Sequence, residues 1–172
     1  MRASVYVGTS LDGFLARRDG AFDFLSPGGD GPHGYEEFFA TVDALVLGRN
    51  TFDVVLAFES WPYGDKPVFV LSSRELPPAP KGAVVEHVSG SPAEIVAQLA
   101  ARGFQHLYVD GGVTIQSFLR AGLIDRLVVS RVPVLIGSGI PLFGALERDI
   151  PLKHVATRTF PGGLVQSEYD VA

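Results

Sequence analysis

Three short segments of this chain carry residue types that bind phosphate groups, and each segment ends or directly follows an apolar run. The segments are Gly48-Arg49-Asn50-Thr51, Leu71-Ser72-Ser73-Arg74 and Asp110-Gly111-Gly112-Val113-Thr114. Glycine lets an anion approach the main chain, whose N–H groups bind phosphate at the start of a helix. An arginine guanidinium can donate two parallel hydrogen bonds to a phosphate, and a hydroxyl adds another donor. Together the segments predict a site for a nucleotide.

The double glycine lies where an apolar strand-like run, residues 107–109, meets a helical pattern. Ile115, Phe118 and Leu119 are spaced i, i+3, i+4, which is typical of one face of a helix. Both glycines permit a positive φ, and the first N–H groups of the helix would point toward a ligand. The same glycines would equally serve a sharp strand-to-helix connection that binds nothing. On this stretch alone both interpretations stay open.

The elements that must position these segments alternate between strands and helices. Strands are predicted over residues 3–8, 44–47, 67–71, 83–87, 107–109 and 127–136, and helices over 34–42, 48–56 and 91–102, with a fourth that ends at Gly122. A C-terminal hairpin pairs residues 152–160 with 164–171. This order predicts one α/β domain over residues 1–172, with three layers: a mostly parallel central sheet, helices on both of its faces, and an antiparallel C-terminal hairpin.

The composition argues against several classes of function. A net charge of −5 and a pI of about 5.3 argue against binding to nucleic acid. The chain has no cysteine, and its four histidines lack the spacing of metal ligands, so no metal is expected. The apolar runs are too short to cross a membrane. We therefore expect a soluble, cytoplasmic protein without membrane or nucleic-acid partners.

The apolar run 127–136 is the longest predicted strand, and Pro133 within it suggests a bulge or a sheet edge. An exposed edge or face of this length needs covering. The sequence therefore predicts a homodimer.

In their order and separations, the three segments resemble the dihydrofolate reductase fold. The resemblance is closest to the reductase domains of riboflavin biosynthesis and to stand-alone bacterial deaminase–reductase domain proteins, and it covers nearly the whole chain. Further matching pieces are Ser10-Leu11-Asp12-Gly13, Gly122-Leu123-Ile124-Asp125 and Pro133-Val134-Leu135-Ile136-Gly137-Ser138-Gly139. The resemblance implies NADPH as the cofactor.

The resemblance also implies roles for individual residues. The implied cofactor-binding residues are Val7, Gly48, Arg49, Thr51, Leu71, Ser72, Ser73, Arg74, Asp110, Gly111, Gly112, Val113 and Thr114. Within this set, the main chain at Gly48 and the hydroxyl of Thr51 would hold the pyrophosphate. Residues 111–114 would cover the phosphate on the nicotinamide side, and Val7 would lie near the nicotinamide.

Arg49 and the turn 72–74 would face the adenosine phosphate. Two guanidiniums and two hydroxyls make this set rich in donors, with Glu75 the only nearby acid. A protein that prefers NADH usually has a carboxylate near the adenosine ribose. The set therefore favours NADPH over NADH.

Asp12 is implied to orient the substrate or to relay the proton that accompanies hydride transfer. A simple Asp-Gly turn explains the same residue equally well. The substrate would lie between the loop after the first strand, the aromatic loop 22–25 and Trp61, with Phe14 and Phe24 among its contacts. The motifs of a zinc deaminase are absent, and the substrate itself stays open.

We therefore predict an NADPH-dependent reductase that transfers a hydride to a small heterocyclic or carbonyl substrate. Two other functions fit the same residues: a non-catalytic nucleotide-binding protein and a structural, dimeric domain.

Overall fold

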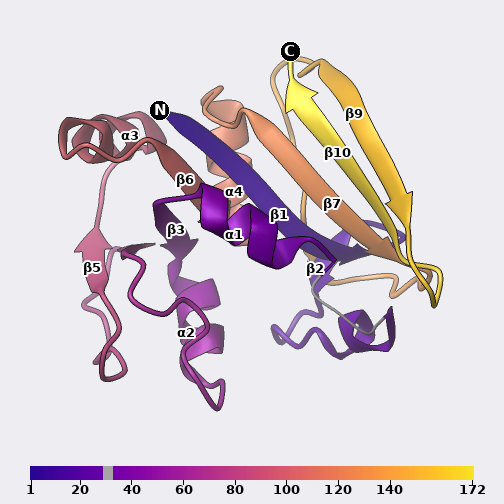
Figure 1. Cartoon of the computed structure of the whole chain (residues 1–172), viewed down its shortest axis with the longest axis horizontal. Helices are drawn as coiled ribbons and strands as arrows, with labels where there is room; N and C mark the ends of the chain where they lie inside the picture. The colour runs from indigo at the N-terminus through magenta and orange to yellow at the C-terminus, as the bar shows by residue number, and fades with distance from the viewer. Residues whose placement is uncertain (29–32) are drawn as a thin grey trace.

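A computed structural model of the chain describes residues 1–28 and 33–172. An eight-stranded sheet runs through the molecule in the order β5-β4-β3-β6-β1-β7-β10-β9 (Figure 1). Its strands are β1 (Arg2–Ser10), β3 (Ala44–Gly48), β4 (Val68–Leu71), β5 (Val85–Val88), β6 (His106–Asp110), β7 (Arg126–Val132), β9 (Leu152–Thr159) and β10 (Val165–Val171). A small second sheet pairs β2 (Phe14–Ala16) with β8 (Ile140–Pro141), and a 3₁₀ helix, η1, spans Asp23–Gly28.

The strand directions confirm the predicted fold class. β5, β4, β3, β6, β1 and β7 are all parallel to one another. β10 pairs antiparallel with both β7 and β9, and these last two strands form the C-terminal hairpin. The sheet is therefore mostly parallel with an antiparallel end.

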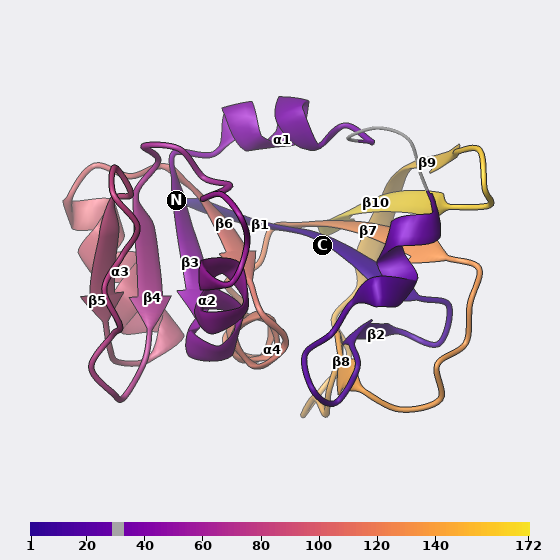
Figure 2. The ribbon, with the colours of Figure 1, turned by 90° about the horizontal axis from the view of Figure 1, so that it is seen from below.

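The described helices cover both faces of the parallel part of the sheet. They are α1 (Tyr35–Thr41), α2 (Arg49–Leu56), α3 (Pro92–Ala101) and α4 (Gly112–Arg120). Leu45 and Leu47 of β3 pack with α1 and α2, whereas Val46 packs with α3 and α4, because successive strand side chains point to opposite faces. Figure 2 shows α1 on one side of the sheet and α4 on the other. None of these helices is long and apolar enough to span a membrane.

The prediction of one strand over residues 127–136 is wrong. β7 ends at Val132, where Pro133 supplies no N–H to continue the ladder. Instead the N–H of Val134 turns back to the carbonyl of Val132, and the carbonyl of Val134 accepts from Leu11. β7 is also not a sheet edge, because it lies between β1 and β10, and the edges are β5 and β9.

The register brings the three segments singled out from the sequence together at the carboxyl ends of neighbouring parallel strands. Gly48 at the end of β3 lies opposite Leu71 of β4, and Leu47 lies opposite Asp110 of β6. Because these strands are parallel, their carboxyl ends are adjacent, which is where open α/β sheets bind ligands.

Candidate functional site

Two strand-to-helix junctions, β3 to α2 and β6 to α4, are packed directly against each other. Each helix begins after a glycine, Gly48 or Gly111, and neither glycine position has a side-chain cap. A Cβ atom on Gly48 would lie 2.6 Å from Oγ1 of Thr114 in α4. A Cβ atom on Gly111 would lie 2.7 Å from Oγ1 of Thr51 in α2. The threonine of each helix thus fills the space beside the glycine that precedes the other helix. The two helix N-termini therefore lie next to each other.

The two adjacent glycines of the second junction have different roles. Gly111 has φ 103° and ψ 132°, a conformation that side chains other than glycine rarely adopt. Gly112 does not have a positive φ, so only the first of the two glycines uses the conformation that both permit. At Gly112 a Cβ atom would instead approach Cγ2 of Ile140 at 3.0 Å and the carbonyl oxygen of Pro141 at 3.1 Å. Gly111 therefore provides the turn, and Gly112 provides room for β8.

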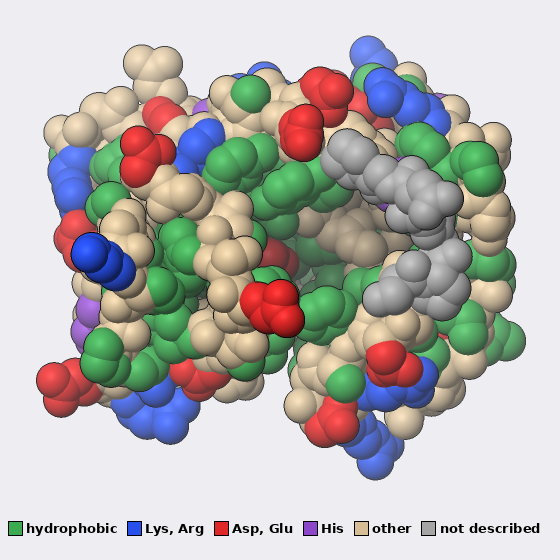
Figure 3. All heavy atoms as spheres, turned by 60° about the horizontal axis from the view of Figure 1, so that its bottom comes forward, with side chains coloured by type: hydrophobic (Ala, Val, Ile, Leu, Met, Phe, Trp, Pro, Cys, Tyr) green, Lys and Arg blue, Asp and Glu red, His purple; other side chains and the backbone are tan. Residues whose placement is uncertain are grey.

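A cavity of about 570 Å³ opens beside the junctions. Figure 3, which turns this side of the molecule forward, shows a hollow flanked by hydrophobic side chains. Ten of the residues singled out from the sequence line the cavity: Val7, Gly48, Arg49, Thr51, Leu71, Asp110, Gly111, Gly112, Val113 and Thr114. This volume is within the range of about 300–1,000 Å³ that is usual for small-molecule sites.

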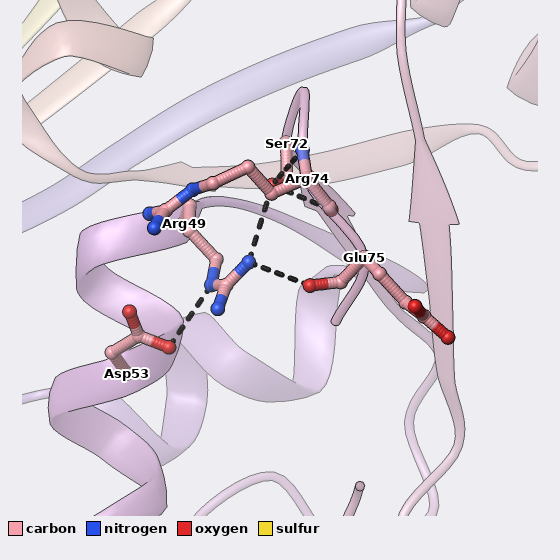
Figure 4. Close-up of polar contacts among 5 residues, drawn as sticks. All are labelled: Arg49, Asp53, Ser72, Arg74 and Glu75. Carbon is pink, nitrogen blue, oxygen red and sulfur yellow. Dashed lines mark hydrogen bonds and ion pairs between the residues drawn. The ribbon is translucent and has the colours of Figure 1, made fainter. Parts of the chain in front are cut away.

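Arg49 ties the start of α2 to the turn after β4 (Figure 4). Its Nε donates to Oδ1 of Asp53 at 3.0 Å, and its Nη1 donates to the carbonyl of Glu75 at 2.9 Å. A longer contact of 3.5 Å joins Nη1 to Oγ of Ser72. These contacts hold Arg49 in place at the cavity wall and leave part of its guanidinium available to bind a ligand.

The turn 72–74 is built by Ser72, whose buried hydroxyl accepts from the N–H of Arg74 at 3.0 Å and donates to its carbonyl at 2.9 Å. Ser73 and Arg74 are exposed. The side chain of Arg74 extends toward the start of α2, beside Arg49 (Figure 4), and has no hydrogen-bond or ion-pair partner among the described residues. Residues 72–74 do not line the cavity themselves. They add a second guanidinium next to it, suited to an anionic group.

Asp110 ends β6 with a half-buried carboxyl group in the cavity wall. Its Oδ1 accepts from the N–H of Gly111 at 2.8 Å. Burial raises the pKa of Asp110 to about 6, although the hydrogen bond from Gly111 acts in the opposite direction. The carboxyl group therefore changes its protonation state close to neutral pH.

Three tyrosines, Tyr6, Tyr63 and Tyr108, line the cavity near Asp110. The hydroxyl of Tyr108 donates to the carbonyl of Tyr6 at 3.1 Å, and Gln166 donates to the hydroxyl of Tyr6 at 3.1 Å. Burial raises the pKa of all three hydroxyls. They therefore stay neutral and give the cavity wall near Asp110 an aromatic surface.

The sequence analysis did not select these tyrosines. A signal for Tyr108 was available in the sequence. Tyr108 and Asp110 are two residues apart on β6, so their side chains point to the same face of the sheet. Other lining residues it did not select are Gly8, Leu15, Ala16, Gly20, Val54, Val55, Phe58 and Ile140. The rings of Phe22 and Phe58 meet edge to face, with centroids 6.0 Å apart, and join the loop after β2 to the end of α2.

Asp12 is exposed in the turn after β1 and does not line the cavity. Its carboxylate accepts from Oγ of Ser10 at 2.6 Å and from the N–H groups of Gly137 at 2.8 Å and Ile136 at 3.3 Å. These bonds, the one from Ser10 above all, hold the pKa of Asp12 below its usual value. In this geometry Asp12 fastens the end of β1 to the segment that follows β7.

Phe14, Phe24 and Trp61, the expected substrate contacts, do not line this cavity either. Phe14 pairs with Pro141 in the small sheet. Phe24 is buried in a cluster with Val132 and Leu164. Trp61 packs edge to face against Phe52 and Tyr63. Of the aromatic loop 22–25, Phe22 and Leu25 are the residues that reach the cavity wall.

Gly111→Ala is expected to lower the free energy of unfolding by about 2–5 kcal/mol, because it combines backbone strain with the clash on Thr51. Gly122→Ala is the matched control, since Gly122 also has a positive φ (70°) but open space around it. The control should lose only about 1–2 kcal/mol. Urea denaturation of both variants measures the difference, and equal losses would contradict the interlocked junctions.

Comparison with known proteins places this geometry in a family. The model of the RibD C-terminal domain matches residues 4–166. A crystal structure from Shewanella sp. PV-4, assigned by its name to riboflavin biosynthesis, is 42% identical with a TM-score of 0.93, covering 100% of this chain and 99% of the other. Protein YwjB of Bacillus subtilis is 32% identical over 168 residues, which are 96% of this chain and 95% of YwjB.

A more distant solved structure shares the fold alone. Dihydrofolate reductase from Enterococcus faecalis has a TM-score of 0.67 at 19% identity, and the match covers 99% of this chain and 96% of that enzyme. The family match extends over nearly the whole sequence, from the first strand to the last. The chain therefore belongs to the RibD C-terminal domain family.

Proposed function

We propose that this protein is an NADPH-dependent reductase that transfers a hydride to a small heterocyclic or carbonyl substrate. The observation that carries the proposal is that one cavity combines two uncapped helix N-termini with an ionisable carboxyl group. Helix N-termini suit the phosphates of a dinucleotide, and the carboxyl group suits proton delivery. Membership of the RibD C-terminal domain family and the riboflavin-related name of the Shewanella structure support reductase chemistry on a heterocycle.

The residues present fit NADPH. Gly48 and Gly111 keep side chains away from the main-chain N–H groups that would bind the pyrophosphate. Arg49 and Arg74 offer guanidinium groups for the additional phosphate on the adenosine side. Val7, within β1, supplies an apolar part of the cavity wall for the nicotinamide. The Enterococcus dihydrofolate reductase, a fold relative, is described in complex with NADP(H), which supports the same cofactor here.

Bound NADPH would supply the hydride that the carbon of a C=N or C=O bond accepts. The heteroatom of that bond gains a proton, and Asp110 is the carboxyl group positioned in the cavity to give it. In its protonated form Asp110 donates a hydrogen bond to the heteroatom and then the proton itself. A pKa of about 6 leaves part of the protein in that form near neutral pH. Tyr6, Tyr63 and Tyr108 provide flat aromatic surface for a planar substrate.

Binding is the first test of the proposal. Saturating NADPH should raise the melting temperature, because a ligand that binds only the native state stabilises it. NADPH oxidation is then followed with a panel of carbonyl and heterocyclic substrates. Binding without oxidation of NADPH by any substrate would favour a non-catalytic nucleotide-binding protein, and absence of any nucleotide effect would favour a structural domain.

Arg74→Ala should weaken NADPH binding about tenfold to a hundredfold and leave NADH binding nearly unchanged, because only NADPH carries the adenosine phosphate. Arg120→Ala, an exposed arginine in the last turn of α4, is the matched control and should affect neither cofactor. Fluorescence titrations with both cofactors at one fixed salt concentration give the four affinities. Equal affinity of the wild type for NADPH and NADH would refute the phosphate assignment.

Asp110→Asn tests the proton donor. The folded-state pKa of about 6 lies above the ordinary value of 3.8, so ionised Asp110 lowers the stability of the native state above pH 6, and this cost disappears as the pH falls below 3.8. The variant should therefore melt at a higher temperature than the wild type at pH 8, and the two should converge toward pH 4.

The same variant should lose about a hundredfold to ten-thousandfold in turnover with any substrate that the wild type reduces. Wild-type turnover should decline as the pH rises above 6, and Asp110→Asn should lack that decline. Asp12→Asn is the comparison that separates the two carboxyl groups. If Asp12→Asn rather than Asp110→Asn removes the decline, the proton comes through Asp12.

A further inference from the structure

Part of the cavity lining is not used by the cofactor assignment. Six lining residues, which come from β1, from the loop and η1 after β2, and from α2 with the residues that follow it, form an apolar wall: Tyr6, Gly8, Phe22, Leu25, Val54 and Phe58. None of these six residues is charged. This apolar wall is the surface that the cavity offers to a substrate.

Contacts between segments that are distant in the sequence make the apolar wall continuous. A Cβ atom on Gly8 would lie 3.4 Å from Cδ2 of Leu25, so η1 packs directly on β1. A Cβ atom on Gly20 would lie 3.7 Å from Cγ2 of Val54. The segment after β2 therefore closes against both β1 and α2.

The tyrosine hydroxyl groups beside the apolar wall already have partners within the protein. The hydroxyl of Tyr6 donates to the carbonyl of His33 at 2.6 Å and accepts from Nε2 of Gln166 at 3.1 Å. The hydroxyl of Tyr108 donates to the carbonyl of Tyr6 at 3.1 Å. These two tyrosines therefore contribute aromatic surface to the cavity rather than free hydroxyl groups.

The cavity contains little charge. Among the described residues that line it, the charged ones are Arg49 and Asp110. Arg49 is tied to Asp53 and to the carbonyl of Glu75, and it is assigned to the adenosine side of the cofactor. A phosphate or carboxylate on the substrate would therefore find no cation of its own in the cavity, and ionised Asp110 would repel it.

The cations that adjoin the cavity lining, Arg17 and Lys66, have partners of their own. Arg17 directly follows β2, and its Nε pairs with Oδ1 of Asp23 at 2.7 Å. Nζ of Lys66 donates to the carbonyl groups of Phe39 and Val42 at the end of α1. Neither cation lines the cavity, so neither offers a partner to an anionic group on the substrate.

Arg158, on β9, is the alternative partner for such a group. A Cβ atom on Gly34, the residue before α1, would lie 3.9 Å from Nη1 of Arg158, and Arg158 does not line the cavity. Residues 29–32, which lie outside the described ranges, contain no lysine or arginine. A substrate phosphate would therefore have to extend out of the cavity to reach Arg158.

We propose that the substrate is a flat heterocycle that carries neither a phosphate nor a carboxylate group. This inference rests on the proposed function, which it narrows. Aromatic surface favours a planar ring, whereas an anionic group would lose its hydration without gaining a partner. A phosphate on the substrate should therefore weaken binding about a hundredfold or more.

Two pairs of flat heterocycles that differ only in a phosphate group test the inference: pyridoxine with its 5′-phosphate, and riboflavin with its 5′-phosphate. Equilibrium dialysis of the full chain with saturating NADP⁺ gives the four dissociation constants. In at least one pair the unphosphorylated compound should bind about a hundredfold more tightly than its phosphate. Equal or tighter binding of the phosphates would overturn the inference, and so would the absence of binding by both unphosphorylated compounds.

Phe58→Lys places a cation in the apolar wall at a side chain that is 42% exposed, so the fold should tolerate it. The preference for the unphosphorylated compound should fall about tenfold or more, because the ammonium group gives the phosphate a partner. Val84→Lys is the matched control, since Val84 is 47% exposed and does not line the cavity, and it should keep the wild-type preference. Circular dichroism confirms that both variants are folded.

An unchanged preference in Phe58→Lys would mean that these compounds do not bind at the apolar wall, which would overturn the inference. If the phosphates bind more tightly and Arg158→Ala removes their advantage, Arg158 is the phosphate site and the inference is wrong.

The dialysis is repeated without NADP⁺ to separate this inference from the proposed function. A preference for the unphosphorylated compounds, combined with no effect of NADPH on the melting temperature, would refute the proposed function and leave the selectivity of the apolar wall in place. NADPH binding combined with a preference for the phosphates would refute this inference alone.

Discussion

The close contact between two helix N-termini is the constraint on which the site depends. Gly48 and Gly111 end neighbouring parallel strands, and the threonine of each following helix occupies the space that a side chain on the opposite glycine would need. Parallel strands bring their carboxyl ends to one edge, but only glycine at both positions lets the helices start this close together. The N–H groups of two helices are thereby directed to one small region, which concentrates positive potential where a dinucleotide phosphate would bind.

Cationic groups and an ionisable carboxyl group lie close to the same pair of junctions. Arg49 and Arg74 lie near the start of α2, with Asp53 as the carboxylate that pairs with Arg49. Asp110 ends the neighbouring strand, opposite Leu47, and burial raises its pKa to about 6. A half-buried acid lowers the stability of the fold at neutral pH when ionised. Its retention in a cavity wall is understandable if the site needs a group that can give a proton.

The segment after β7 connects features that are far apart in the sequence. Its N–H groups hold Asp12, its residues Ile140 and Pro141 pair with β2 and approach Gly112, and Phe143 lines an apolar groove over β7, β10 and β9. The cavity and the groove therefore share one structural element.

Local patterns determined the elements of this protein and the three segments that meet at the cavity, because strand alternation, helix spacing and glycine at the junctions are encoded over a few neighbouring residues. Sequence could not show that Gly48 packs on Thr114, or that the hydroxyl of Tyr108 donates to the carbonyl of Tyr6, since these contacts join residues about 60 to 100 positions apart. The sequence analysis also placed Asp12, Phe14, Phe24 and Trp61 at the site. In the folded protein Asp12 holds a turn and Phe14 pairs in the small sheet, while Phe24 and Trp61 pack against other apolar residues. Residue type sets what a side chain can do. Which distant elements pack against a side chain decides the direction in which it points, and for Asp110 this packing also decides the burial that raises its pKa.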